Sequence, residues 1–192
     1  MPEAVAMVPL TSLLLPIVLA AVVVFLASSV IHMATPWHKG DLRKVGDEDG
    51  VMASLRPFNL PPGDYALPMA GSMEAMKSPD FQAKMNEGPV VFMTVRPAGP
   101  AKMGTNLGVW FVYSLVVSLI AGYVASRAVA PGTDYLHVFR FAGVTAFAGY
   151  SLALAQNSIW WGRNWGMTLR SMVDGLLYAL LTAGVFGWLW PK

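Results

Sequence analysis

Three histidines are the side chains of this 192-residue chain that could bind a metal ion or a haem. His32 and His38 lie close together in the sequence, but no carboxylate or third histidine completes a ligand set at a spacing typical of metal sites. His137 begins a different apolar segment, and a chain that alternates across a membrane places it on the opposite side from His32. We therefore expect no metal site and no cofactor.

Three methionines, Met69, Met73 and Met76, are a second set of candidate ligands, because thioethers select Cu(I). Their spacing is also that of one face of an amphipathic helix, where methionine is an adaptable apolar filler. Thioether-only sites are uncommon, so we favour the filler interpretation. Metal binding by these three residues stays open as the alternative.

Catalytic patterns are missing from the sequence. The chain has no cysteine, which excludes disulfides, thiolate metal sites and cysteine nucleophiles. It also lacks G-x-S-x-G, H-E-x-x-H, a P-loop, a dinucleotide fingerprint and carboxylates paired for acid–base work. We predict that the chain is not an enzyme.

The composition indicates a membrane protein. Hydrophobic residues make up 55% of the chain and charged residues only 12%, against roughly 25% charged residues in soluble domains. A helix that crosses the hydrocarbon layer needs about 20 apolar residues. The intervals that satisfy this condition or come close to it are 10–33, 107–126, 141–158 and 175–190. The sequence therefore predicts an all-α polytopic membrane protein with four transmembrane helices.

An extramembrane loop of about 70 residues separates the first two spans. Asp47 is a plausible helix N-cap, and Ser78 followed by proline is another. The β-branched run 90–96 can pair with residues 64–67, which predicts a small β-hairpin beside the short helices. We divide the chain into a first transmembrane helix with a short N-terminal tail, the loop subdomain and a three-helix transmembrane bundle, with the bounds 1–35, 36–104 and 105–192.

Small residues at four-residue spacing mark helix-packing faces in the second and fourth spans, because they allow the backbones of helices in lipid to approach closely. We expect the last three spans to form one antiparallel bundle. The first span is bulky and contains Pro16, so we expect it at the periphery. The predicted packing residues are Ser114, Ser118, Gly122 and Ser126 in the second span, and Gly175, Ala179, Ala183 and Gly187 in the fourth.

Aromatic and charged side chains gather in the connection before the fourth span. An aromatic belt with two arginines that reach the headgroups is one interpretation. A docking surface for a partner subunit or an anionic lipid is the other, because Trp and Arg are typical anchors of interfaces. We also expect Arg170 and Asp174 to form a pair along one helix. The candidate docking residues are Trp160, Trp161, Arg163, Trp165, Arg170 and Asp174.

Basic residues predict the orientation. Only Arg127, Arg140 and Lys192, of thirteen Lys and Arg residues, fall on the side of the membrane that holds the two termini. The positive-inside rule therefore places both termini outside and the long loop in the cytoplasm. The membrane that fits best is a bacterial cytoplasmic (inner) membrane.

The predicted function follows from these patterns. Without a catalytic motif, and with an ordered-looking loop too small to fold alone, the chain is expected to be a non-catalytic accessory or assembly subunit of a larger integral membrane protein complex. The alternative is a small oligomeric transporter or channel with a polar path along Tyr113, Ser114 and Ser118. The expected partners are the lipid bilayer and protein subunits. A net charge of +2 gives no reason to expect nucleic acid.

Overall fold

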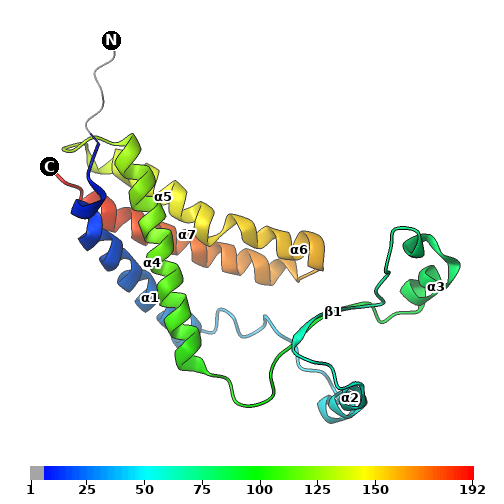
Figure 1. Ribbon diagram of the computed structural model, residues 1–192. Coiled ribbons are helices and arrows are strands. Elements are labelled where there is room, and N and C mark those ends of the chain that lie inside the picture. Colours follow the sequence, from blue (N-terminus) through cyan, green and yellow to red (C-terminus); the bar gives the residue numbers. More distant parts are fainter. Residues whose placement is uncertain (1–6) are drawn as a thin grey trace. The chain divides into compact units, whose positions relative to one another are not determined.

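The computed structural model describes residues 7–192 (Figure 1). It is mostly helical, has four helices long and apolar enough to cross a bilayer, and contains a two-stranded sheet. Contacts within the chain divide it into a helical unit, Met1–Leu42 with Lys102–Lys192, and a loop unit, Arg43–Ala101. Residues 1–6, the start of the expected N-terminal tail, lie outside the described residues.

Helices account for almost all of the helical unit. A short 3-10 turn, Leu10–Leu13, leads directly into α1 (Leu14–Ala34). The later long helices are α4 (Met103–Ala128), α5 (Tyr135–Tyr150) and α7 (Trp165–Trp188). Between the last two, a 3-10 turn (Leu152–Leu154) and α6 (Ala155–Trp161) continue α5. The four expected spans thus correspond to four long helical segments.

The fourth helix begins ten residues before the apolar interval that predicted it. Gly162 ends α6 in the left-handed region at φ +63°, as glycine commonly does after a helix. Asn164 then caps α7, where its side chain accepts hydrogen bonds from the backbone amides of Gly166 and Met167. The charged residues in the first turns of α7 hid this start, because a hydropathy search excludes them.

The four long helices pack in the cyclic order α1, α4, α5, α7. The expectation that the first span lies at the periphery is wrong. In α1, 33% of the apolar window is buried, against 28% in α4, and Ile17, Ala20 and Val24 face the interior. A small-residue face in α1 allows this contact, despite the bulk of its other residues.

Small residues lie where the helices approach most closely. Ser114, Ser118 and Ser126 of α4 are fully buried. A Cβ added to Gly122 would lie 3.0 Å from the ring of Phe186, and one added to Gly187 would lie 2.7 Å from the ring of Tyr135. Polar side chains also join the helices, since Trp110 Nε1 of α4 donates to Ser28 Oγ of α1 at 2.8 Å.

The loop unit contains the predicted two-stranded sheet. Strand β1 (Gly63–Leu67) pairs with β2 (Val91–Val95) in antiparallel register, with Tyr65 opposite Met93. Helix α2 (Glu48–Leu55) is capped by Asp47, and α3 (Pro79–Glu87) is capped by Ser78. Both predicted N-caps are therefore confirmed.

The helical stripe expected for the three loop methionines is wrong. Met69 and Met73 lie outside any helix, and Met76 lies in the 3-10 turn Ala75–Lys77. Gly71 stands between the first two methionines, and the next α-helix starts only at Pro79. All three side chains are exposed.

Candidate functional site

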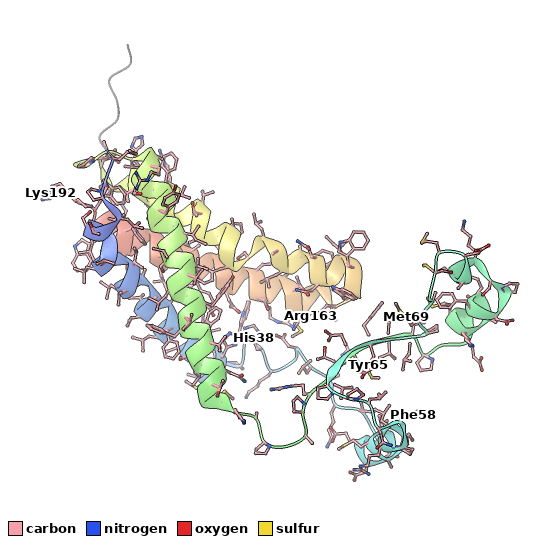
Figure 2. All side chains as sticks on the ribbon, viewed as in Figure 1. His38, Phe58, Tyr65, Met69, Arg163 and Lys192 are labelled. Atoms are coloured by element: carbon pink, nitrogen blue, oxygen red, sulfur yellow. The ribbon has the colours of Figure 1, made fainter. Side chains whose placement is uncertain are left out.

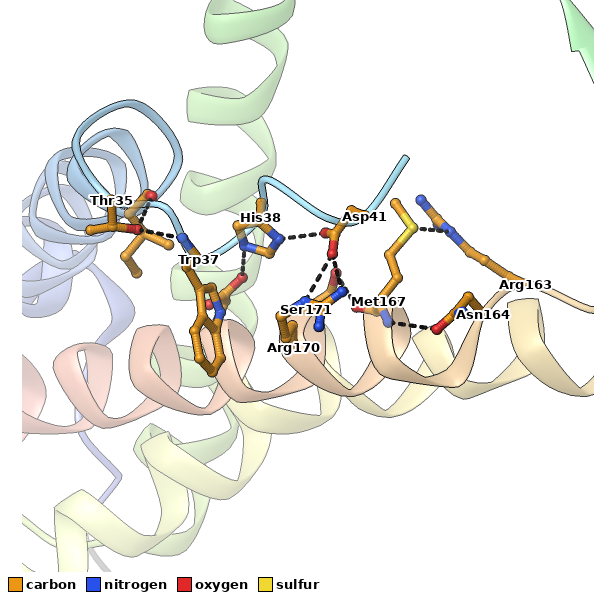
Figure 3. Close-up of polar contacts among 11 residues, drawn as sticks. Thr35, Trp37, His38, Asp41, Arg163, Asn164, Met167, Arg170 and Ser171 are labelled. Carbon is orange, nitrogen blue, oxygen red and sulfur yellow. Dashed lines mark hydrogen bonds and ion pairs between the residues drawn. The ribbon is translucent and has the colours of Figure 1, made fainter. Parts of the chain in front are cut away.

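The segment that follows α1 folds back onto α7 within the helical unit. Thr35 ends α1 in an extended conformation. Two tight turns follow, closed by hydrogen bonds from the amide of Lys39 to the carbonyl of Pro36 and from the amide of Asp41 to the carbonyl of His38, both 3.1 Å long. These turns bring the side chains of His38 and Asp41 to α7 (Figure 3).

Five side chains meet there and form what we call the His–Asp–Arg cluster. His38 Nδ1 lies 2.6 Å from Asp41 Oδ2, and His38 Nε2 lies 2.7 Å from Asp174 Oδ2. Arg170 Nε donates to Asp41 Oδ1 at 2.8 Å, and Arg170 Nη2 donates to the same oxygen. The members are His32, His38, Asp41, Arg170 and Asp174, of which Figure 3 labels His38, Asp41 and Arg170.

The two carboxylates of the cluster are shielded from solvent. The side chains of Asp41 and Asp174 are 8% and 7% exposed. Burial acts to raise the pKa of Asp41, but the hydrogen bonds from His38 and Arg170 and the charge of Arg170 outweigh it, so that the pKa lies below its ordinary value. Asp41 is therefore an anion at neutral pH.

His32 completes the cluster from the last turn of α1. Its ring stacks on the ring of His38, with centroids 4.4 Å apart and planes 25° apart. Both rings line an open groove of about 430 Å³, which Lys39 and Arg163 also border. The groove lining includes both imidazoles and the carboxylate of Asp41, but not Asp174.

The predicted docking residues separate into two groups. The side chains of Trp160, Trp161 and Trp165 are exposed by 73%, 60% and 50%, and they lie around the turn from α6 to α7. Arg163 lies in this turn, where its Nε donates to Met167 Sδ at 3.3 Å.

Arg170 and Asp174 instead belong to the His–Asp–Arg cluster. The structure pairs Arg170 with Asp41 and Asp174 with His38, rather than pairing the two with each other as expected. Asp174 is also the tenth residue of α7, about 14 Å along the helix axis from its start.

Asp41 was not singled out from the sequence, and His38 was considered only together with His32. No carboxylate follows this pair at a typical sequence spacing, but the fold brings Asp174 to it from 136 residues beyond His38. One local signal was available, namely that His38 and Asp41 are three residues apart after a proline, a spacing that a tight turn closes.

A second histidine–aspartate pair provides a comparison within the same chain. His137 Nδ1 lies 2.6 Å from Asp134 Oδ2, again with a three-residue spacing, at the start of α5. These side chains are 59% and 61% exposed. The hydrogen bond from His137 holds the pKa of Asp134 below its ordinary value. Among residues 7–192, this pair is not part of a group of three metal-binding side chains.

The chain was also compared with protein-family models, with curated proteins and with solved structures. No family model, curated protein or solved structure matches it. Its function is therefore argued from its own residues and their geometry.

Proposed function

We propose that this chain is a non-catalytic accessory or assembly subunit of a larger integral membrane protein complex. In this proposal its four long helices cross a bacterial cytoplasmic membrane, both termini lie outside, and the loop unit contacts a protein partner. Three sets of observations support the proposal, and the first carries most of the argument.

The loop unit has secondary structure but no core. Every residue from 43 to 101 is described, and none of them is buried. A two-stranded sheet is marginal by itself, and small scaffolds without a sufficient core rely on disulfides, a metal or a partner to stay folded. The chain has no cysteine. A partner surface that covers the loop unit would supply the missing apolar contacts.

Large apolar side chains of the loop unit are available for such a contact. Phe58, just after α2, is 70% exposed, and Met69, just after β1, is 75% exposed (Figure 2). Met73 is 73% exposed. Exposed apolar side chains can supply the contacts of an interaction surface when they form a contiguous patch.

The turn from α6 to α7 supports the same function. Its three exposed tryptophans and Arg163 are of the residue types that are enriched among interface hot spots. An aromatic belt at the headgroups accounts for the tryptophans equally well. This third observation therefore adds less weight than the missing core of the loop unit.

Purification from the native membrane in a mild detergent tests the proposal. At native expression, we expect other subunits to co-elute with the chain at a constant ratio. The double variant Phe58→Glu and Met69→Glu should lose most of this co-elution, because it places charge in the proposed contact. Asn86→Glu adds a charge at an exposed position of α3 and should retain the partners. A chain that elutes alone or only with its own copies would overturn the proposal.

One observation favours the alternative of a transporter or channel. Among residues 7–192, Ser118 Oγ and Tyr178 Oη are buried without a hydrogen-bond partner. Such hydroxyl groups normally bind another polar group or water. A polar path along α4 would provide that water.

Cysteine labelling distinguishes a packed interior from a water-filled path. Because Ser114 and Ser118 are fully buried, we expect Ser114→Cys and Ser118→Cys to stay unlabelled by an aqueous thiol reagent in this cysteine-free chain. Ala53→Cys, at an exposed position of α2, is the positive control. Labelling of Cys at 114 or 118 at the rate of the control would favour transport over the subunit role.

A further inference from the structure

Three side chains from separate parts of the helical unit present metal-binding atoms to one another in the His–Asp–Arg cluster. His32 belongs to the last turn of α1, His38 to the segment after it, and Asp174 to α7. One donor atom of each lies within 4.8 Å of the donor atoms of the other two. We propose that His32, His38 and Asp174 bind one divalent transition-metal ion. This inference does not depend on the proposed subunit role.

His38 lies between two carboxylates. Its Nδ1 lies 2.6 Å from Asp41 Oδ2, and its Nε2 lies 2.7 Å from Asp174 Oδ2. Imidazole nitrogens and carboxylate oxygens are ligands that Zn²⁺ takes in proteins. The contact between Nε2 and Asp174 therefore brings two ligand atoms of one site side by side.

Asp41 and Arg170 act as the outer shell of the site. Histidines that bind metals almost always donate their second ring N–H to a carboxylate, a carbonyl or water, which fixes the tautomer and orients the ring. With Nδ1 as the donor, Asp41 is such an acceptor, and Nε2 is left for the metal. Arg170 in turn holds Asp41 through two guanidinium nitrogens. His38 is therefore oriented for coordination before any ion binds.

The groove beside the two histidines gives an ion access to their rings, and it has room for a fourth ligand. It is open to solvent and has a volume of about 430 Å³. Two histidines and one carboxylate leave one position of a tetrahedral ion for water or a small anion. Lys39 and Arg163 border the groove, and their charges favour an anionic fourth ligand such as hydroxide or chloride.

Binding requires a rotation of the exposed His32 ring, because a metal ion lies in the plane of the imidazole that binds it and the rings of His32 and His38 are stacked. Bonds of 2.0–2.2 Å to a tetrahedral zinc ion place the donor atoms about 3.3 Å from one another. The contact between His38 Nε2 and Asp174 opens to this value from 2.7 Å. The side chain of His32, which is exposed at the end of α1, moves inward from a separation of at most 4.8 Å.

Metal titration of the purified full-length chain tests the proposal. The protein is prepared in detergent without a polyhistidine tag, treated with a chelator, and titrated with ZnCl₂ or CoCl₂. We expect one Zn²⁺ per chain and, with Co²⁺, the visible absorption of a four-coordinate site. His38→Ala, Asp174→Asn and His32→Ala each remove a ligand and should weaken Zn²⁺ binding by at least the roughly 10-fold to 100-fold that the loss of an outer-shell partner costs.

Two further variants separate metal binding from structural effects. Asp41→Asn keeps all three ligands and should weaken binding by about 10-fold to 100-fold, as outer-shell substitutions do. His137→Ala removes the other histidine that is paired with an aspartate, and it should leave the affinity and the Co²⁺ spectrum unchanged. Zn²⁺ binding that does not saturate at one ion, or that falls equally in His137→Ala, would overturn the proposal.

Discussion

Arg170→Ala is expected to release the segment 35–42 from α7, with a loss of about 3 kcal/mol in the local stability of this contact. Arg170 supplies the positive charge that faces the buried carboxylate of Asp41. Removal of one partner from a shielded ion pair leaves a desolvated charge, which costs much more than the pair contributes. The side chain of Arg170 is 31% exposed, so we expect a value at the lower end of the range for such pairs.

Hydrogen exchange measures this release directly. The amides of Lys39 and Asp41 are hydrogen-bonded in the two turns, so their exchange reports opening of the segment. In metal-free buffer, Arg170→Ala should speed their exchange by about 100-fold, which is the equivalent of 3 kcal/mol. Arg163→Ala is the matched control, because Arg163 borders the same groove but its Nε donates to a sulfur atom. Equal exchange in the two variants would contradict a holding role for Arg170.

Gly175→Ala is expected to lower the free energy of unfolding of the helical unit by about 2 kcal/mol. A Cβ at this position would lie 2.9 Å from the carbonyl oxygen of Tyr150 and would overlap the hydroxyl of Ser151. Ser151 is fully buried, and its Oγ donates to the carbonyl of Met172. The added methyl group therefore has to push α7 away from the end of α5 or break this hydrogen bond.

Unfolding of the purified protein in mixed detergents, followed by circular dichroism, measures the effect. Gly108→Ala is the control, because Gly108 lies in α4 with no atom within 4 Å of the added Cβ. This control should be neutral or more stable by up to about 1 kcal/mol, since alanine is the better helix former. If Gly175→Ala had the same midpoint of unfolding in the detergent titration as Gly108→Ala, the close contact between α5 and α7 would not hold in solution.

Much of the secondary structure could be predicted from the sequence because its causes are local. Uncharged apolar runs of sufficient length predict long helices, and these appear as α1, α4, α5 with α6, and α7. Asp47 and Ser78 cap their helices through side-chain oxygens that reach amides within the next turn. Alternation and β-branched residues predicted the pairing of β1 with β2. Each of these features depends on neighbours along the chain.

Features that depend on distant residues were predicted poorly. The position of α1 in the bundle depends on how its small residues match those of α4 and α7, which hydropathy does not describe. The early start of α7 was not predicted, because Arg170 and Asp174 are charged and charged residues were taken to mark the end of an apolar interval. In the structure, side chains from another segment contact both groups, since Asp41 pairs with Arg170 and His38 with Asp174.

The sequence by itself therefore determined that the chain forms long apolar helices and a loop with short capped elements, because length, hydropathy and capping are local properties. Only the tertiary structure decided that His32, His38, Asp41, Arg170 and Asp174 form one cluster. Their contacts join the end of α1 to a helix more than 120 residues later. The pairing of such groups is set by the packing of α1 against α7 and by the turns that follow α1, which no local pattern encodes.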